Sequence, residues 1–322
     1  VLLETGGLAY ARGDQVFVLS PDGAEAWRIG GEGRIVGLAR LPGDRLAVRT
    51  TLGAAYVAQG GRYLARWSVD PIDAPIVTVG ETIAVLSGDG LTGYTSLGGA
   101  LWTIPNTGRT VSLLSDDSAF VWAARDVDGR VVWRVIAPDG TVNIEERLEH
   151  VYPVTGVVPV IGWAVLDGTS ALRLSGGSLV NGAQVPIQPG LSAAITGSPS
   201  GDLYVYAGDG ERTLLAIAPD GTVRWRVRYP IAPGSNAPLM GVGSGCALYT
   251  LDSDGMLNAF DTADGTLRGQ AQIYAGGSDT AQPDSRYLQV FPNDQLVVSA
   301  GFLSTILING APLAGEACGV TP

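Results

Sequence analysis

The chain of 322 residues has no lysine, a single histidine, two cysteines and no long apolar run. All 20 basic residues are therefore arginine, and 31 acidic residues give a net charge of −11 at pH 7. This acidic balance argues against a nucleic-acid partner or an anionic membrane surface, because both attract basic proteins. A membrane-spanning helix needs roughly 18 or more apolar residues in a row. No such run exists, so the sequence predicts no transmembrane segment.

The scarcity of histidine and cysteine excludes several kinds of site. With only His150 present, a metal centre of several histidines is excluded, and a serine triad has no supporting context. We expect His150 at the surface or at a sheet edge. Cys246 and Cys318 lie too far apart for a CxxC redox or zinc motif.

The two cysteines leave two interpretations open. If the chain is extracytoplasmic, a disulfide between Cys246 and Cys318 would tether the C-terminal tail, a constraint worth about 4 kcal/mol. The alternative is one buried thiol and one thiol in the tail. The sequence starts at Val1 without methionine, which is compatible with a removed signal or lipoprotein leader and equally with trimming. The expected location is periplasmic or extracellular, with a lipid anchor left open.

What the sequence has in excess is glycine, proline and apolar residues. It contains 46 glycines and 19 prolines, and 46% of its residues are hydrophobic. Such a composition is typical of a turn-rich β protein rather than a disordered chain. Folding a chain of this length buries roughly three quarters of its surface, so a large core is available.

The segment 213–229, TLLAIAPDGTVRWRVRY, is a β-hairpin with a Pro-Asp-Gly turn and strict alternation after it. Related glycine turns recur at a period near 40 residues, which is typical of propeller blades. The turn glycines are Gly23, Gly61, Gly99, Gly140, Gly177, Gly221, Gly265 and Gly310.

Each repeat has four expected strands. An innermost strand rich in small residues precedes two apolar middle strands, and a polar-alternating outermost strand follows the glycine turn. The sequence therefore predicts an all-β β-propeller of eight four-stranded blades, with seven as the alternative, in a single domain over 1–322. The first blade is the weakest, because its inner strand could only be the short segment 1–6. The segment 143–150, NIEERLEH, looks helical but falls in register with an outer strand, so we expect a strand there.

Three tryptophans follow turn glycines at the same distance. Trp27, Trp102 and Trp225 each come four residues after a glycine, on expected outer strands, whereas Trp67 is offset. This pattern resembles the repeat of the pyrroloquinoline-quinone-like (PQQ-like) β-propeller family. The resemblance spans most of the chain and implies that Trp27, Trp102 and Trp225 dock neighbouring blades against each other. Stacking of these rings on a carbohydrate is the alternative.

The resemblance is closer to the non-catalytic members of that family. Its quinone dehydrogenases are longer and carry a vicinal cysteine pair, calcium-ligating acids and a catalytic aspartate, none of which maps onto this sequence. The outer-membrane assembly lipoprotein propeller, a scaffold, is the nearer type. The resemblance therefore implies a protein that is not an enzyme and holds no cofactor.

Three acidic turns leave calcium as an open alternative. They span 126–129 (DVDG), 252–255 (DSDG) and 261–265 (DTADG), and oxygen ligands on tight turns suit calcium. None has the glutamate that an EF-hand requires. We expect ordinary turns, because aspartate and glycine are what these turns need anyway.

Three functions remain open. The first is a scaffold that binds another protein or an assembly, with the basic strip Arg224, Arg226 and Arg228 as its expected partner surface. The second is a quinone- or carbohydrate-related enzyme or ligand binder with a site at the axial funnel. The third is a structural component of a cell-surface layer or appendage. The expected funnel residues, on loops beside the inner strands, are Arg40, Asp44, Asp116 and Asp117.

Overall fold

The structure is a computed structural model of the whole chain. It describes residues 1, 3–72, 74–106, 108–115, 118–148, 156–160, 162–166, 170–175, 178–179, 185–186, 193–198, 200–207, 212–230, 237–243, 246–274, 286–290, 294–300 and 305–314. The chain divides into two compact units, Val1–Val151 and Tyr152–Pro322, and each is described by itself. The single domain predicted over 1–322 stays a prediction.

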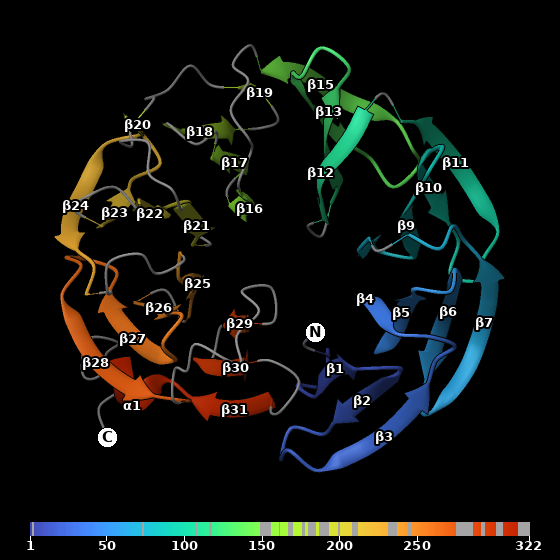
Figure 1. Ribbon diagram of the computed structural model, residues 1–322, viewed down its shortest axis with the longest axis horizontal. Coiled ribbons are helices and arrows are strands. Elements are labelled where there is room, and N and C mark those ends of the chain that lie inside the picture. Colours follow the sequence, from blue (N-terminus) through green and yellow to red (C-terminus); the bar gives the residue numbers. More distant parts are fainter. Residues whose placement is uncertain are drawn as a thin grey trace. The chain divides into compact units, whose positions relative to one another are not determined.

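The first unit contains four antiparallel sheets, each formed by strands that are consecutive in the chain (Figure 1). Their orders are β1-β2-β3, β4-β5-β6-β7, β8-β9-β10-β11 and β12-β13-β14-β15. The strands are β1 (Leu8–Arg12), β2 (Gln15–Leu19), β3 (Glu25–Gly30), β4 (Ile35–Leu41), β5 (Arg45–Thr50), β6 (Ala54–Gln59), β7 (Arg62–Ser68), β8 (Ile76–Val79), β9 (Thr82–Ser87), β10 (Gly90–Tyr94), β11 (Ala100–Pro105), β12 (Gly108–Ser115), β13 (Phe120–Asp126), β14 (Val131–Ile136) and β15 (Val142–Leu148).

The second unit repeats the pattern. Its sheets have the orders β16-β17-β18-β19 with β20 also on β18, β21-β22-β23-β24, β25-β26-β27-β28 and β29-β30-β31. The elements are β16 (Gly156–Val160), β17 (Gly162–Leu166), β18 (Ser170–Ser175), β19 (Ser178–Leu179), β20 (Val185–Pro186), β21 (Ala193–Gly197), β22 (Leu203–Ala207), β23 (Thr213–Ile217), β24 (Val223–Arg228), β25 (Leu239–Val242), β26 (Ala247–Leu251), β27 (Met256–Asp261), β28 (Leu267–Gln272), β29 (Arg286–Val290), β30 (Gln295–Ala300), β31 (Thr305–Asn309) and α1 (Ala311–Ala314).

Within each unit, the first strands of successive sheets lie next to one another. In the first unit β1 contacts β4, β4 contacts β8 and β8 contacts β12; in the second β16, β21, β25 and β29 follow the same rule. Four-stranded antiparallel meanders joined in this way are propeller blades. The predicted all-β propeller fold is confirmed, and every repeat except the first has an inner strand before its two middle strands, as the sequence indicated.

The burial of the strands explains their composition. The middle strands β14, β22 and β23 are buried at every position, because sheets pack against both of their faces. The outer strands β3, β7, β11, β24 and β28 alternate between exposed and more buried residues. The described part of the segment with helical character, residues 143–148, lies in the strand β15, as expected.

A bulge is shared by the outer strands β3, β7, β11, β15, β24 and β28. Next to the glycine turn, one residue of the outer strand has no opposite residue on its neighbour. In β24 this residue is Arg224, since Ile217 faces Val223 and Ala216 faces Trp225. Such a bulge bends and twists the edge strand.

The predicted number of four-stranded blades is wrong. Among the described residues, six sheets have four or more strands, whereas the sheets β1–β3 and β29–β31 have three. At the first sheet, Val1 exchanges two backbone hydrogen bonds with Ala9, and the chain then turns at Gly6 instead of continuing as an inner strand. At the last sheet, α1 follows Gly310 in place of an outer strand. Pro312 favours this, because proline cannot donate to a strand ladder and fits the first turn of a helix.

The helix α1 packs on the outer strand of the preceding sheet. A Cβ on Gly269 of β28 would lie 2.5 Å from the carbonyl oxygen of Leu313, so only glycine allows this approach. In the described part of the chain, no helix has the length and apolar character that a membrane span requires.

Candidate interaction surface

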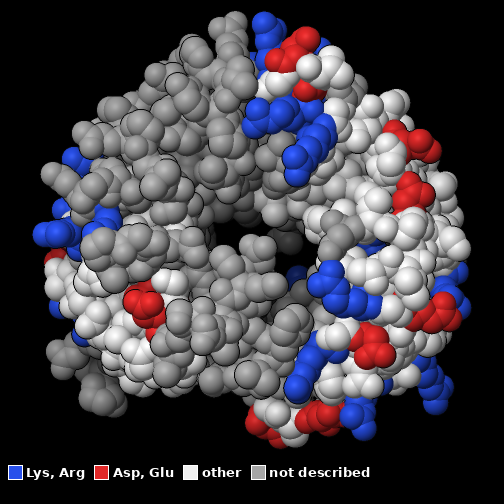
Figure 2. Space-filling model, viewed as in Figure 1, with Lys and Arg blue, Asp and Glu red and all other residues white. Residues whose placement is uncertain are grey.

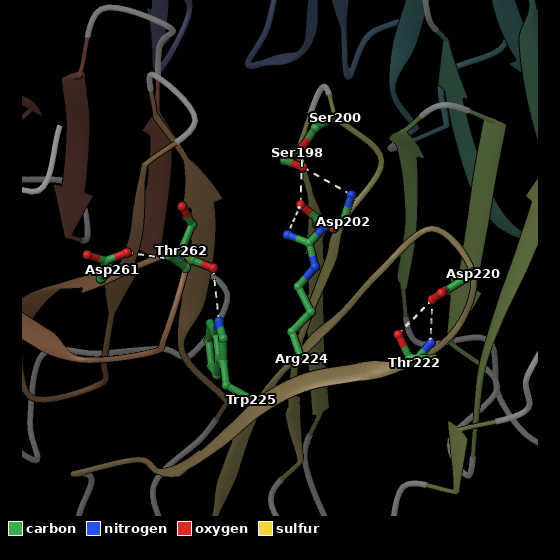
Figure 3. A network of polar contacts seen from close by, with 10 residues as sticks. Ser198, Ser200, Asp202, Asp220, Thr222, Arg224, Trp225, Asp261 and Thr262 are labelled. Carbon is green, nitrogen blue, oxygen red and sulfur yellow. Dashed lines mark hydrogen bonds and ion pairs between the residues drawn. The ribbon is translucent and has the colours of Figure 1, made fainter. Parts of the chain in front are cut away.

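Two tryptophans bind the turn of the sheet that follows their own. Trp225 of β24 donates from Nε1 to the carbonyl oxygen of Thr262 at 2.9 Å (Figure 3). Trp102 of β11 donates to the carbonyl oxygen of Pro138 at 2.8 Å. Each ring lies on the turn glycine, since a Cβ on Gly265 or Gly140 would come within 2.7 Å or 2.4 Å of it. These contacts are those that blade docking requires; the docking role itself remains a prediction.

Two further tryptophans lie against the next turn without such a hydrogen bond. Trp27 of β3 is half-buried and lies beside Gly61, at 3.7 Å from the position of a Cβ there. Trp67 of β7 packs on Gly98, 2.8 Å from the corresponding position. The sequence set Trp67 apart because of its spacing from Gly61. Trp67 faces Ala55 of β6, and despite its different spacing its ring contacts the turn glycine of the next sheet.

The predicted arginine strip lies on β24, the edge strand of its sheet. Arg224, Arg226 and Arg228 are all exposed, whereas Trp225 and Val227 are more buried. We call these three arginines the arginine edge. Figure 2 shows basic side chains gathered over β24. Basic side chains also gather over β12 of the first unit, and acidic and basic side chains are interspersed on the rest of its described surface.

The three arginines are not equivalent. Arg224, at the bulge, pairs through its Nη1 with Oδ2 of Asp202 at 3.2 Å. Among the described residues, Arg226 and Arg228 have no ion-pair or hydrogen-bond partner for their guanidinium groups. An ion pair therefore holds Arg224, whereas the guanidinium groups of Arg226 and Arg228 are available to a partner.

The partner of Arg224 belongs to a nearly buried polar network (Figure 3). Asp202 is 5% exposed, and its Oδ2 accepts from Ser200 Oγ at 3.2 Å, while its backbone N–H donates to Ser198 Oγ at 3.1 Å. Burial, followed by the charge of Asp202, raises the pKa of the Tyr204 hydroxyl to about 12. This network holds the turn beneath the arginine edge.

A second network fixes the far end of β24. The hydroxyl group of Tyr229 lies 2.6 Å from Thr250 Oγ1 and accepts from Asn258 Nδ2 at 3.0 Å. Gln270 Nε2 in turn donates to Asn258 Oδ1 at 2.7 Å. Burial raises the pKa of Tyr229 above its ordinary value. Hydrogen bonds and an ion pair therefore hold both ends of β24, the strand that carries the arginine edge.

The acidic turns use their carboxylates for their own backbone. Oδ1 of Asp126 accepts the N–H groups of Asp128 and Arg130, and Oδ1 of Asp252 accepts those of Asp254 and Met256. In the part of the chain that is described, no three His, Cys, Asp or Glu residues form a group that could hold a metal ion. These contacts are those of ordinary turns, and none of them favours calcium binding at the described turns.

The other expected site residues are only partly described. Asp44 accepts from the backbone N–H groups of Glu4 and Thr5, and Arg40 is exposed at the end of β4. The loop aspartates 116 and 117, the histidine at 150 and Cys318 lie outside the described residues. Cys246 precedes β26 and is not a free thiol. The disulfide stays a prediction.

A comparison of the sequence with protein-family models shows the family to which the chain belongs. The family model described as outer membrane protein assembly factor BamB matches residues 121–302, more than half of the chain. The chain belongs to the BamB-like propeller family. The resemblance to PQQ-like propellers predicted from the tryptophan and glycine pattern is thereby confirmed.

Solved structures share the fold of this BamB-like chain at low sequence identity. BamB from Moraxella catarrhalis is 15% identical, with a TM-score of 0.67 over 93% of this chain and 92% of that one. Apo AztD from Citrobacter koseri is 12% identical, with a TM-score of 0.67 over 95% and 92%. Chaetomium thermophilum Sqt1, solved with the N-terminus of ribosomal protein L10, is 15% identical, with a TM-score of 0.66 over 94% and 92%. No curated protein sequence matches the chain.

Proposed function

We propose that this BamB-like chain is a non-catalytic, extracytoplasmic scaffold that binds another protein through the arginine edge of β24. The observation that carries the proposal is the pair Arg226 and Arg228, exposed and without a partner among the described residues of a chain with net charge −11. The family supports a role in protein assembly, since its description names an assembly factor. We also propose that residues 1–322 form one domain.

A fixed edge favours binding over chemistry. The networks of Asp202 and Tyr229 hold β24 in place before a partner binds, so binding loses little conformational entropy in this strand. Charged side chains at an interface mainly select the partner and accelerate the encounter. The expected partner is therefore a protein with an acidic surface, because the net charge of −11 disfavours a nucleic acid.

The experiment is affinity purification from the native source with three forms of the chain. The strip variant is R226Q/R228Q, and the control is R28Q/R62Q, which removes the same charge from the exposed outer-strand arginines Arg28 and Arg62. We expect one stoichiometric protein to be retained by the wild type and the control and lost by the strip variant. Retention by all three forms would contradict the arginine edge as the site. Measurable turnover of quinone or sugar substrates would contradict the non-catalytic role.

A further inference from the structure

The outer edge of β24 has free backbone groups as well as free arginines. The strand is the last in its sheet, and no other described strand pairs with it. An edge strand presents unpaired N–H and C=O groups to any extended chain alongside it. The equivalent strand β28 differs, because α1 packs against it.

The spacing of the two available arginines is that of a strand. Arg226 and Arg228 are two residues apart in a regular stretch that begins after the bulge at Arg224. Their side chains therefore leave the same face of the sheet, roughly 7 Å apart along the strand. An extended segment paired with this edge has the same period, so every second side chain could meet an arginine.

The chemistry of the arginines specifies those side chains. A guanidinium group matches a carboxylate in geometry and charge and can donate two parallel hydrogen bonds to it. Arg224 already shows this choice of partner within the chain, in its contact with Asp202. The charge of the arginine edge is therefore complementary to acidic residues at alternate positions.

Protection of the edge against aggregation is the competing explanation for its arginines. The edge strand β11, with the sequence ALWTIP, shows that an outer strand of this fold does not need charged residues for such protection. This strand has no charged residue, and its Leu101 is 52% exposed. Arginines do occur on other outer strands, but Arg28 of β3 and Arg66 of β7 are held in ion pairs. The described residues include no ion-pair partner for Arg226 or Arg228. Recognition of a partner accounts for this difference better than protection does.

We propose that the partner segment is an extended acidic stretch, with carboxylates at alternate positions, that pairs as an added strand with the edge of β24. The proposal rests on the proposed function and names the chemistry of its partner. Strand addition supplies affinity through the backbone, and the alternating side chains supply specificity.

Two labelled peptides of the same composition test the register. One alternates, Thr-Glu-Thr-Glu-Thr-Glu-Thr, and the other groups its acids, Thr-Thr-Glu-Glu-Glu-Thr-Thr. By fluorescence anisotropy at low salt, we expect the alternating peptide to bind at least fivefold more tightly. We expect R226Q/R228Q to weaken its binding roughly tenfold, since each exposed pair contributes modestly, while the charge-matched R28Q/R62Q leaves it unchanged. Added salt should weaken binding through screening.

Amide hydrogen exchange and an N-methylated peptide test whether the peptide pairs with the backbone of β24. Amide hydrogen exchange should slow at Trp225–Arg228 when the alternating peptide is bound, and an N-methylated form of that peptide should lose most of its affinity. Equal affinity of the alternating and grouped peptides, no binding, or unchanged exchange at β24 would overturn the proposal. If the peptides fail while a native partner is still lost from R226Q/R228Q, only this inference is wrong. If the partner is also retained by that variant, the proposed function fails as well.

Discussion

Removal of the Trp225 ring should destabilise the second unit strongly. Trp225 is only 8% exposed, lies on Gly265 and hydrogen-bonds to the carbonyl oxygen of Thr262. Replacing a buried tryptophan by alanine costs about 3–5 kcal/mol, because the lost burial and the cavity left behind add together. We therefore expect W225A to lower the free energy of unfolding by about 3–5 kcal/mol.

Two matched variants separate the contributions to this cost. W225F keeps an aromatic ring but leaves the Thr262 carbonyl group without its donor, which costs about 1–2 kcal/mol. W27A removes a half-buried ring that has no indole hydrogen bond in the described structure, so its cost should be roughly 1–2 kcal/mol. The predicted order of destabilisation is W225A first, with W225F and W27A well behind.

The assay is urea unfolding followed by circular dichroism, which does not depend on tryptophan emission. Each unfolding midpoint is converted to a free energy with the slope of the wild type where the slopes agree. A loss below about 1 kcal/mol for W225A, or equal losses for W225A and W27A, would refute the inter-sheet contact as a main source of stability.

Three further predictions concern glycine, tyrosine and cysteine. G265A should destabilise the protein more than G23A. Both glycines have a positive φ, but a Cβ at Gly265 would meet the ring of Trp225, whereas a Cβ at Gly23 would meet nothing within 4 Å. The urea midpoints of the two variants measure the difference. The pKa of Tyr204 is raised to about 12 in the folded state, so its contribution to stability is complete below pH 10 and lost as the pH rises from 10 to 12; Y204F should flatten that decline in an alkaline series of unfolding curves. A peptide map under non-reducing conditions should join Cys246 to Cys318, and reduction should lower the unfolding free energy by about 4 kcal/mol; two free thiols in the native protein would show the pairing to be wrong.

The strand pattern was predictable because local sequence and tertiary burial agree in these repeats. The mostly apolar segments 8–12, 203–207 and 247–251, for example, form the strands β1, β22 and β26. Turn chemistry also agrees: Asp220 accepts the N–H group and the hydroxyl group of Thr222, which holds the pKa of Asp220 below its ordinary value.

The features that escaped prediction depend on neighbouring sheets or on chain ends. Trp67 contacts the turn glycine Gly98 of the next sheet, and the spacing of residues within one repeat cannot show a contact between two sheets. The four residues of α1 are too few for a helical period. The arginine edge was found by alternation alone, but the sequence could not show that Asp202 holds Arg224 and leaves Arg226 and Arg228 available.

Site-specific photo-crosslinking in the native source tests the central claim most directly. A photoreactive residue placed at Arg226 is compared with the same residue at Arg62, which is exposed on an outer strand of the first unit. Binding of a partner at the edge of β24 predicts one discrete crosslinked protein from position 226, joined through an acidic segment, and none from position 62. The same products from both positions, or none from position 226, would contradict the account.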